Sequence, residues 1–526
     1  MDLIKNLTEA YAAYLRDESR AVGYADTISF PKTEAEIVEI VKYCAQRDIP
    51  INIQGSRTGL SGGASPQGGH VLNLSRMGKI LGLRYDAGKG AYYLRVQPGV
   101  LLLQVRKALE TKNFDISGWD AASKAALSQI KPGELIFGPD PTEPTAALGG
   151  MAACNASGSR SLLYGPMRDH VEKLRVVLAD GSVTALCRGG TRAKGLSFEL
   201  PLAGGGVFRG VMPDYKTPQT KDAGFFIKPD MEMIDLFIGS MGTLGVISEL
   251  ELRLCGAPAH QWGVTAFLPD DYAAIEYVRI LRGERRPGKP AFSHKPAAIE
   301  FFDKQTLDMV VRQKAFTPSF RQLQELPAAY ASAIYAEFNE ESEAAMWGTL
   351  EALCDVLVSV GGDPADSWVA NGLRNMEKLI FFRHTVPECV NLIVDENKKQ
   401  NPDITILSAD MAVPDQYIQE VYDMYHNDLA AKCRQWIIFG HIGETHYHPD
   451  IFPKTNEEYD AGMGIFEDWA RQVRQWGGTI TAEHGVGKLK KNLARILYGE
   501  ENYEKLRRFK RSMDPKYLLS PGNIID

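Results

Sequence analysis

Three separate glycine-rich segments constrain the fold of this chain more than any other feature. They span residues 54–64, 148–158 and 239–245, all in the first half of the sequence. Glycine lets backbone N–H groups turn inward and approach a bound group closely. One such segment alone is more often just a loop, but three of them indicate a scaffold that binds a ligand largely through backbone.

The first segment directly follows a predicted strand, 49–53, and reads Gln-Gly-Ser-Arg-Thr-Gly-Leu-Ser-Gly-Gly-Ala. Its glycines suit a pyrophosphate, and its hydroxyl side chains add hydrogen-bond donors. No helical pattern follows it, so it is not the dinucleotide motif of a Rossmann fold. No Gly-Lys-Ser/Thr closes it, so it is not a Walker A loop either.

Small residues characterise the second segment, and the third leads into a predicted strand, 246–254. Ala152, Ala153, Ala156 and Ser157 leave room for a large, flat group to lie on the backbone. The two segments therefore strengthen the prediction of a phosphate-bearing ligand with a flat ring system.

Length and composition limit the classes of protein. A chain of 526 residues predicts about two to four domains. Hydrophobic residues make up 44% and charged residues 24%, which is an ordinary globular composition. The formal net charge of -7 argues against a nucleic-acid partner, because phosphate backbones attract basic surfaces. A small anionic substrate needs only a local cluster of Arg or Lys.

The seven cysteines are scattered singly, without a Cys-x-x-Cys pair. This argues against a zinc ribbon or an iron–sulfur cluster in the chain and fits a reducing compartment. The first 20 residues are charged throughout and predict a helix rather than a signal peptide. No apolar run approaches the roughly 18–20 residues needed to span a bilayer. We therefore expect a cytoplasmic protein, with any membrane attachment peripheral and through a partner.

Glycine clusters are missing from residues 256–435, where helical patterns alternate with short strands such as 331–335 and 404–407. This change predicts a second domain. Residues 201–225 are rich in Gly, Pro and Lys and are predicted to form a loop. The segments 111–135, a candidate surface insertion, and 195–225 carry no motif to which a role can be assigned.

A second candidate site lies near the C-terminal end of the predicted second domain. Three of the ten histidines, His441, His446 and His448, fall within eight residues, just after a predicted strand that ends at Gly440. Neutral imidazoles joined by a carboxylate suit Zn²⁺, Fe²⁺ or Mn²⁺. Glu483 is the obvious carboxylate. The alternative is a histidine cluster that holds no metal.

The glycine segments resemble, in order, the FAD domain of the vanillyl-alcohol oxidase and p-cresol methylhydroxylase flavoprotein superfamily. The resemblance also covers Tyr164-Gly165, Arg168-Asp169 and the predicted strand 176–181. The C-terminal motifs are similar to the branch with FAD-linked D-lactate, glycolate and D-2-hydroxyglutarate dehydrogenases. These motifs are His441…His448, Glu483-His484-Gly485 and Asp514-Pro515…Ser520-Pro521-Gly522. The likeness covers nearly the whole chain.

The resemblance implies an α+β fold. It implies a two-subdomain FAD-binding domain of the p-cresol methylhydroxylase type, plus a cap domain with an antiparallel sheet and flanking helices. We expect residues 1–255 to form the FAD-binding domain, 256–480 to form the cap or substrate domain, and 481–526 to return to the FAD domain.

The implied FAD contacts fall on the three glycine segments and their flanks. They are Gly55, Ser56, Arg57, Thr58, Gly59, Gly62, Gly63, Pro139, Thr142, Gly149, Gly150, Ala153, Asn155, Ser157, Gly158, Gly242, Val246 and Ile247. Some members attach the flavin through His or Cys near the first segment. Residues 54–69 contain neither, so non-covalent FAD is the better interpretation, although His70 follows directly. Met241 replaces an acidic residue that is usual in this branch.

The resemblance also assigns roles at the second site. His441, His448 and Glu483 match metal ligands, with Zn²⁺ preferred over Fe²⁺ or Mn²⁺, and His484 matches a general base. Arg383 matches a residue that binds the substrate carboxylate, although a surface or structural Arg is the alternative. His446 stands where Asn is usual, and a ligand role for it ranks below His441 and His448.

The reaction implied is oxidation of a small D-2-hydroxy acid to the 2-oxo acid, with metal-assisted deprotonation of the hydroxyl and hydride transfer to flavin N5. Ser408 occupies a position where some members carry Lys, which favours a monocarboxylate such as D-lactate over D-2-hydroxyglutarate. The alternatives are an FAD transferase like alkylglycerone-phosphate synthase and an electron-transfer subunit without a substrate site. The electron acceptor is left open among quinone, cytochrome, electron-transfer flavoprotein and an iron–sulfur partner, as is a homodimer.

Overall fold

The computed structural model describes residues 2–215, 218, 224–402 and 404–526. The chain forms two compact units. Unit 1 comprises Met1–Gly158, Gly165–Ala257 and Thr481–Asp526, and unit 2 comprises Ser159–Tyr164 and Pro258–Ile480. Ser159–Tyr164, which the sequence analysis assigned to the FAD-binding range, therefore belongs with unit 2.

Unit 1 contains a four-stranded sheet in the order β1-β2-β4-β3, in which β2, β4 and β3 run parallel. The helix α1 (Glu34–Ala45) packs its apolar face into this part of the core, and Thr33 caps it by accepting a hydrogen bond from the Glu36 N–H. The strands are β1 (Ile4–Asn6), β2 (Thr27–Ser29), β3 (Ile51–Gln54) and β4 (His70–Asn73).

A five-stranded antiparallel sheet in the order β5-β6-β12-β8-β9 forms the second part of unit 1. Its strands are β5 (Ile80–Asp86), β6 (Ala91–Val96), β8 (Val171–Val177), β9 (Val183–Cys187) and β12 (Val246–Arg253). The short strands β7 (Leu135–Ile136) and β13 (Cys255–Gly256) pair with each other. The helices here are α2 (Leu102–Thr111), α3 (Ala121–Gln129), α4 (Leu148–Cys154) and α6 (Met167–His170).

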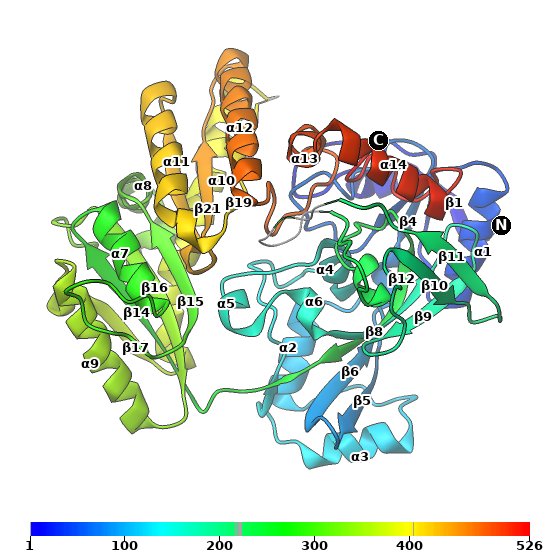
Figure 1. Cartoon of the computed structure of the whole chain (residues 1–526), viewed down its shortest axis with the longest axis horizontal. Helices are drawn as coiled ribbons and strands as arrows, with labels where there is room; N and C mark the ends of the chain where they lie inside the picture. Colours follow the sequence, from blue (N-terminus) through cyan, green and yellow to red (C-terminus); the bar gives the residue numbers. More distant parts are fainter. Residues whose placement is uncertain (1, 216–217, 219–223, 403) are drawn as a thin grey trace. The chain divides into compact units, whose positions relative to one another are not determined.

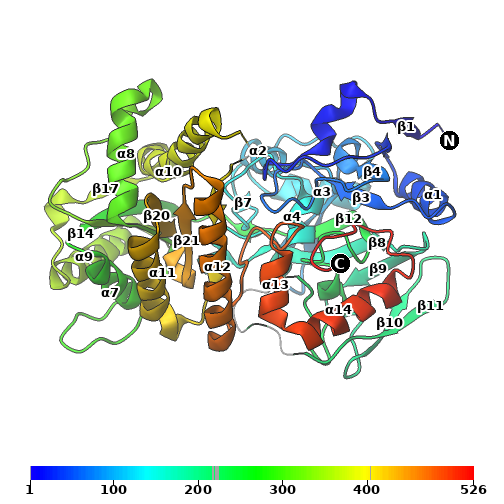
Figure 2. The ribbon, with the colours of Figure 1, turned by 90° about the horizontal axis from the view of Figure 1, so that it is seen from above.

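The C-terminal segment completes unit 1. Its helices α13 (Lys491–Tyr498) and α14 (Glu500–Met513) lead to a stretch that joins the first sheet, where Ile51 donates to the Leu518 carbonyl and accepts from the Ser520 N–H. Figures 1 and 2 show α14 beside the hairpin of β10 (Ser197–Pro201) and β11 (Val207–Val211). Residues about 470 positions apart in the sequence are thus backbone partners.

Unit 2 is built on one large antiparallel sheet in the order β17-β14-β16-β15-β20-β21-β18, with β19 also paired to β21. Its strands are β14 (His260–Leu268), β15 (Pro296–Phe302), β16 (Ser332–Glu340), β17 (Trp368–Asn371), β18 (Leu407–Ser408), β19 (Met411–Ala412), β20 (Trp436–Gly440) and β21 (His446–Ile451). This matches the cap architecture that the resemblance implied.

Helices cover both faces of the unit 2 sheet. Figure 2 shows α8 and α10 on one face, and α7, α9 and α11 on the other. The helices are α5 (Ser161–Tyr164), α7 (Asp271–Leu281), α8 (Lys304–Phe316), α9 (Glu343–Ser359), α10 (Leu373–Gln400), α11 (Ile418–Lys432) and α12 (Asn456–Trp476). The apolar core between α8, α10 and the sheet includes Phe302, Phe382 and Val310.

Three predictions of local structure were wrong. The first 20 residues contain β1 and a 3-10 helix, Glu9–Leu15, because pairing of Ile4–Asn6 with β2 overrides the helical preference. The predicted loop 201–225 contains β11, while residues 216–217 and 219–223 lie outside the described part. The predicted strand 404–407 shrinks to a two-residue strand at Leu407–Ser408.

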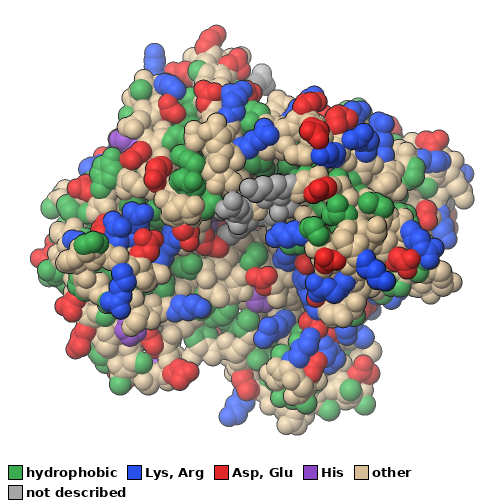
Figure 3. Space-filling view, in the orientation of Figure 1, with side chains coloured by type: hydrophobic (Ala, Val, Ile, Leu, Met, Phe, Trp, Pro, Cys, Tyr) green, Lys and Arg blue, Asp and Glu red, His purple; other side chains and the backbone are tan. Residues whose placement is uncertain are grey.

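The surface shown in Figure 3 carries acidic and basic side chains interspersed, with hydrophobic side chains scattered among them. Scattered exposed apolar residues are usual for globular proteins. Within the described residues, no helix combines the length and apolarity required for crossing a membrane.

Candidate active site

A cavity of about 260 Å³ in unit 1 lies where the three glycine segments meet. The predicted FAD-contact residues at its wall are Gly55, Ser56, Arg57, Thr58, Gly59, Gly63, Thr142, Gly149, Gly150, Ala153, Ser157, Gly242 and Ile247. Five other predicted residues lie outside the wall: Gly62, Pro139, Asn155, Gly158 and Val246. Ser61, whose hydroxyl the sequence offered as a donor, also lies at the wall, together with Asp17, Met241 and Asn523, which the sequence did not single out as contacts.

Two adjacent glycines in α4 have different physical roles. A Cβ at Gly149 would lie 2.5 Å from Cβ of Pro98, so a side chain there has no room. A Cβ at Gly150 would meet nothing within 4 Å, because Gly150 faces the open cavity. Gly149 therefore permits close packing of α4, whereas Gly150 keeps space for a ligand.

The glycine segments are tied together by hydrogen bonds. The N–H groups of Gly239 and Met241 donate to the carbonyls of Ala152 and Ala153 at 3.0 and 2.8 Å, which joins the third segment to the second. The Asn523 side-chain amide donates to the carbonyls of Gly63 and Met241 at 3.1 and 3.2 Å. Asn523, from the C-terminal segment, thus clamps the first segment to the third.

Lys488 supports the same junction. Its Nζ donates to the Gly63 carbonyl at 3.1 Å and to Oδ1 of Asn523 at 2.9 Å. Burial lowers the pKa of Lys488 to about 8, although the Asp17 carboxylate opposes this change. The family departure at Met241 lies here too: its sulfur accepts a contact from the Gly487 N–H at 3.1 Å. A thioether therefore fills a position where an acidic residue is usual, without breaking the turn.

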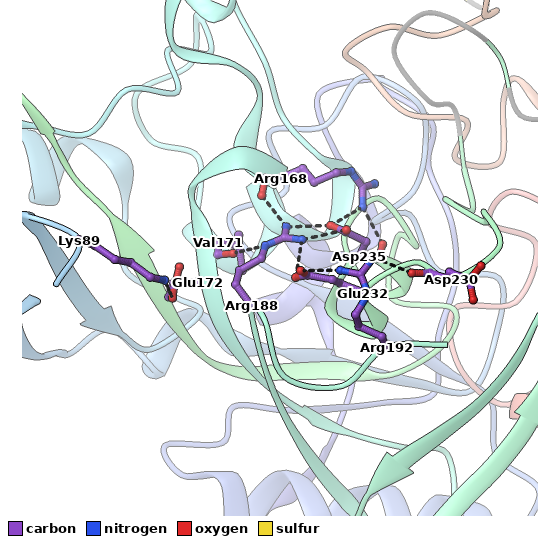
Figure 4. A network of polar contacts seen from close by, with 9 residues as sticks. All are labelled: Lys89, Arg168, Val171, Glu172, Arg188, Arg192, Asp230, Glu232 and Asp235. Atoms are coloured by element: carbon purple, nitrogen blue, oxygen red, sulfur yellow. Dashed lines mark hydrogen bonds and ion pairs between the residues drawn. The ribbon is translucent and has the colours of Figure 1, made fainter. Parts of the chain in front are cut away.

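An ion-pair network in unit 1 involves residues that directly precede the third segment in the chain, and Figure 4 shows its members Arg168, Arg188 and Asp235. Arg168 donates to the carbonyls of Asp235 and Ile238 at 2.7 and 2.8 Å, and Arg188 makes two bonds of 2.7 and 2.8 Å to the Asp235 carboxylate. Because these groups are largely buried, each bond matters more than a surface ion pair would. The network fixes the backbone that enters the Gly239–Gly245 turn.

Glu483 and His484 both line the unit 1 cavity. The hydroxyl of Ser157 donates to Oε1 of Glu483 at 3.2 Å, which connects this carboxylate to the second glycine segment. The hydroxyl of Ser61 donates to the His484 backbone carbonyl at 3.0 Å. The chain is thus held at His484 through its backbone, and the imidazole is not used for this contact.

His70 has a structural role. Its Nδ1 lies 2.8 Å from Oγ1 of Thr27, its Nε2 lies 2.7 Å from Oγ of Ser29, and the ring is fully buried. Burial lowers the pKa of His70 to about 4, so the imidazole stays neutral. Both ring nitrogens have partners in the sheet, which disfavours a flavin link at this residue.

The three clustered histidines lie in unit 2, around the turn from β20 to β21. Gly440 has a φ of +139°, and a Cβ there would lie 2.8 Å from the His446 carbonyl oxygen. Thr445 has a φ of 52°, which is unfavourable for a β-branched residue. Its hydroxyl accepts a hydrogen bond from the Arg282 guanidinium at 3.0 Å and donates one to the Asp415 carboxylate at 2.9 Å. These two hydrogen bonds maintain the turn.

The turn brings the three imidazoles together. The ring centroids of His446 and His448, on one face of β21, lie 4.4 Å apart, and His441 lies 5.5 and 5.4 Å from them. One ring nitrogen from each histidine lies within 4.8 Å of the others. All three rings are buried. This donor set fits a divalent metal that prefers nitrogen ligands.

Glu300 connects this cluster to Arg383. Its Oε1 lies 2.7 Å from Nδ1 of His441, and its Oε2 lies 3.5 Å from Nε of Arg383. The pairing of β15 with β20, in which Phe301 faces Gly440, brings Glu300 beside His441. Arg383 is only 11% exposed in its side chain, so it is not a solvated surface residue.

Sequence reasoning missed Glu300 and Asp410. Asp410 is fully buried, and its Oδ1 lies 3.0 Å from Nε2 of His446. The only signal in the sequence was a single charged residue within an apolar stretch, as in Ala-Ile-Glu-Phe-Phe at 298–302. Their partners come from strands far along the chain, and sheet register does not follow from such a signal.

Comparison with known families decides the class of protein. Residues 290–524 match the family described as FAD linked oxidases, C-terminal domain, and residues 25–125 and 121–186 match the FAD binding domain. The chain belongs to the FAD-linked oxidase family. It is an FAD-linked oxidoreductase of the vanillyl-alcohol oxidase and p-cresol methylhydroxylase superfamily, and the first two glycine segments lie within the matched FAD binding domain.

Curated relatives of this FAD-linked oxidoreductase include hydroxy-acid dehydrogenases. It is 27% identical to a probable mitochondrial D-lactate dehydrogenase of Danio rerio, over 97% of this chain and 86% of that protein. Glycolate oxidase subunit GlcD of Bacillus subtilis is also 27% identical, with 95% and 88% coverage. A mitochondrial D-2-hydroxyglutarate dehydrogenase of Rattus norvegicus is 24% identical, with 95% and 78% coverage.

Solved structures share the fold of this oxidoreductase. An alkyldihydroxyacetonephosphate synthase superposes with a TM-score of 0.60 at 14% identity, and the match covers 99% of this chain and 83% of that chain. At this identity the likeness establishes the architecture alone.

Proposed function

We propose that this protein oxidises a small D-2-hydroxy acid to the 2-oxo acid, and that D-lactate is its preferred substrate. The observation that carries the proposal is the arrangement around Glu300: one carboxylate contacts both a histidine of a three-imidazole cluster and the cation Arg383. Such a site can hold a metal and an organic carboxylate next to each other. The relatives named as D-lactate and D-2-hydroxyglutarate dehydrogenases support the same class of substrate.

FAD in this proposal is bound without a covalent link and supplies a two-electron acceptor when present. FAD would lie in the unit 1 cavity, because its wall contains glycines, hydroxyls and Asn523, which suit backbone and hydrogen-bond contacts to a dinucleotide. The engagement of both nitrogens of His70 supports the non-covalent assignment. We propose unit 1 (Met1–Gly158, Gly165–Ala257 and Thr481–Asp526) as the FAD-binding domain and unit 2 (Ser159–Tyr164 and Pro258–Ile480) as the cap.

His441, His448 and Glu483 would hold a divalent metal, with Zn²⁺ preferred, and that metal would supply polarisation of the substrate hydroxyl. The hydrogen bond from Ser157 restrains the Glu483 carboxylate in unit 1. The imidazole of His484 takes the hydroxyl proton. Arg383 binds the substrate carboxylate, because a guanidinium offers paired donors that match its two oxygens.

Ser408 supports a monocarboxylate. It is a half-buried residue at the end of β18, with a short neutral side chain where some members of the branch place Lys. A second carboxylate, as in D-2-hydroxyglutarate, would have no cation to meet at this position. The electron acceptor in the proposal is a quinone, a cytochrome or a protein carrying a flavin or an iron–sulfur cluster.

Anaerobic flavin bleaching tests the proposal. Protein replete in FAD and metal is mixed with D- and L-forms of lactate, glycolate and 2-hydroxyglutarate, and metal content is measured on the same sample. D-Lactate is expected to bleach the flavin fastest. Protein that carries FAD and metal but is reduced by none of these acids would refute the proposal.

A matched variant tests the substrate assignment. Ser408→Lys supplies the missing cation and is expected to shift preference from D-lactate toward D-2-hydroxyglutarate. An unchanged ratio of kcat/KM for the two acids would show that this position does not face the substrate. Formation of an alkyl ether and a free fatty acid from an acyl-glycerone phosphate and a long-chain alcohol, without net flavin reduction, would point instead to the transferase alternative.

A further inference from the structure

His446 differs from an ordinary core histidine in how its ring nitrogens are used. It opens β21, is fully buried, and its Nε2 lies 3.0 Å from Oδ1 of Asp410, which is also fully buried. Its Nδ1 is buried and has no hydrogen-bond partner among the described residues. A buried polar atom without a partner costs stability, so such an atom calls for a ligand.

All three histidines of the cluster are supported in the manner of metal ligands. A metal-bound histidine usually donates its other ring N–H to a carboxylate or a backbone carbonyl. His441 contacts the Glu300 carboxylate through Nδ1 at 2.7 Å, and His448 contacts the Ala409 carbonyl through Nδ1 at 3.2 Å. His446 meets the Asp410 carboxylate through Nε2. The pattern is complete for His446 as well.

We propose that His446 is a third imidazole ligand, through Nδ1, of the metal site in this protein, and that Asp410 orients it. This inference rests on the proposed function, which assigns the metal to His441, His448 and Glu483. It adds a nitrogen donor where the branch usually has Asn. Unit 2 alone then provides three imidazoles from one turn and one strand.

The added imidazole changes which metal the site selects. Imidazole suits Zn²⁺ and other late first-row ions, whereas oxygen-rich sites suit Mn²⁺. His446 is therefore expected to raise the preference for Zn²⁺ over Mn²⁺. A residue that merely fills space would affect both ions alike.

The test uses the full-length, FAD-bound protein after removal of metal with a chelator. Dissociation constants for Zn²⁺ and Mn²⁺ are measured by competition, and the visible spectrum is recorded with Co²⁺. The variants are His446→Asn, Asp410→Asn and Glu483→Gln, with His426→Asn as a matched control, because His426 lies in unit 2 outside the cluster. Circular dichroism and flavin content confirm that each variant is folded.

His446→Asn is expected to weaken Zn²⁺ binding by at least about 10-fold, to weaken Mn²⁺ binding less, and to change the Co²⁺ spectrum. Asp410→Asn is expected to weaken Zn²⁺ about 10-fold. Glu483→Gln is expected to leave the protein able to bind Zn²⁺, because three imidazoles remain. His426→Asn is expected to match the parent protein.

A folded His446→Asn variant with the parent Zn²⁺ affinity and Co²⁺ spectrum overturns this inference. In that case a further variant, His441→Asn, is examined. If it no longer binds Zn²⁺, and D-lactate bleaches the flavin of the parent protein, the proposed function stands without this inference. Parent protein that binds no Zn²⁺, Mn²⁺ or Co²⁺ overturns the inference together with the metal role in the proposed function.

Discussion

The carboxylate of Glu300 holds the imidazole of His441, with Oε1 2.7 Å from Nδ1. This contact fixes which ring nitrogen of His441 faces the other histidines, and the second oxygen of the same carboxylate lies 3.5 Å from Arg383. A carboxylate behind a metal-binding histidine raises the basicity of the ligand and fixes its orientation. Glu300 therefore positions two groups that the proposed function assigns to metal and substrate, His441 and Arg383.

Replacing Glu300 tests this positioning role. Glu300→Gln keeps the shape but removes the charge, and we expect metal affinity and kcat/KM for the hydroxy acid to fall by about 10–100-fold. Metal competition and steady-state kinetics measure the two effects. Glu337→Gln is the control, because Glu337 is a buried carboxylate of β16 that pairs with Arg160 at 2.7 Å instead. Equal effects in both variants would mean that the loss is only structural.

Gly149 and Gly150 are expected to respond oppositely to the same substitution. Gly149→Ala places a Cβ against Pro98 and should destabilise the protein by about 1–3 kcal/mol, measured as the free energy of unfolding without FAD. Gly150→Ala has open space and replaces a helical glycine, so stability without FAD should hold or rise by up to about 1 kcal/mol.

The same Gly150→Ala variant is expected to bind FAD more weakly, by roughly 10-fold, because the new methyl group enters the cavity. Fluorescence titration of the apoprotein with FAD measures this. Undiminished FAD affinity would show that the flavin does not approach this part of α4.

Removal of the His484 imidazole separates chemistry from cofactor binding. His484→Ala should slow flavin reduction by about 10²–10⁴-fold while FAD stays bound, because Ser61 bonds the His484 backbone and not its ring. Stopped-flow reduction and flavin-to-protein ratio are the two measurements. His260→Ala serves as control, and a reduction rate that is unchanged in His484→Ala would exclude His484 as the base.

A buried carboxyl makes the stability of unit 2 depend on pH. Burial, with a smaller contribution from Asp271, raises the pKa of Asp303 to about 8. The folded state therefore keeps a proton on Asp303 up to about pH 8, whereas the unfolded chain releases it near pH 4. The contribution of this proton to the free energy of unfolding is complete below about pH 4 and is lost as the pH rises through about 8. We expect a slope of up to about 1.4 kcal/mol per pH unit in this range from this group.

Asp303→Asn removes the titration but keeps the helix cap, since Oδ1 accepts from the Thr306 N–H at 2.8 Å and Asn can do the same. Urea unfolding between pH 5 and 8 should show a shallower fall in stability for this variant. Asp363→Asn, at an exposed cap of unit 2, is the comparison. Parallel pH profiles for the parent and Asp303→Asn would contradict the assignment.

Sequence reasoning succeeded where the information was local. The glycine segments, the strand that ends at Gly440 and the shared face of His446 and His448 all follow from residue order and period. The resemblance added the FAD domain and the antiparallel cap, and the family match confirms the class.

The register of the sheet in unit 2 could not be predicted from the sequence. Glu300 lies beside His441 because Phe301 faces Gly440 in the sheet, and Asp410 lies beside His446 because Ala412 faces His446. Both pairings join strands separated by long stretches of chain, and a shift of one residue would turn each carboxylate to the opposite face. Likewise, Ile4–Asn6 forms a strand only because β2 is available to pair with it.

The two hydrogen bonds of the Asn523 side chain have a consequence for the order of synthesis and cofactor binding. The carbonyls of Gly63 and Met241 acquire their common donor only after about 460 further residues have followed Gly63 out of the ribosome. A chain whose synthesis stops before Asn523 leaves the first and third segments unjoined and should retain flavin poorly. We therefore expect flavin to be retained only once translation has passed Asn523, and products truncated before it to lack the cofactor.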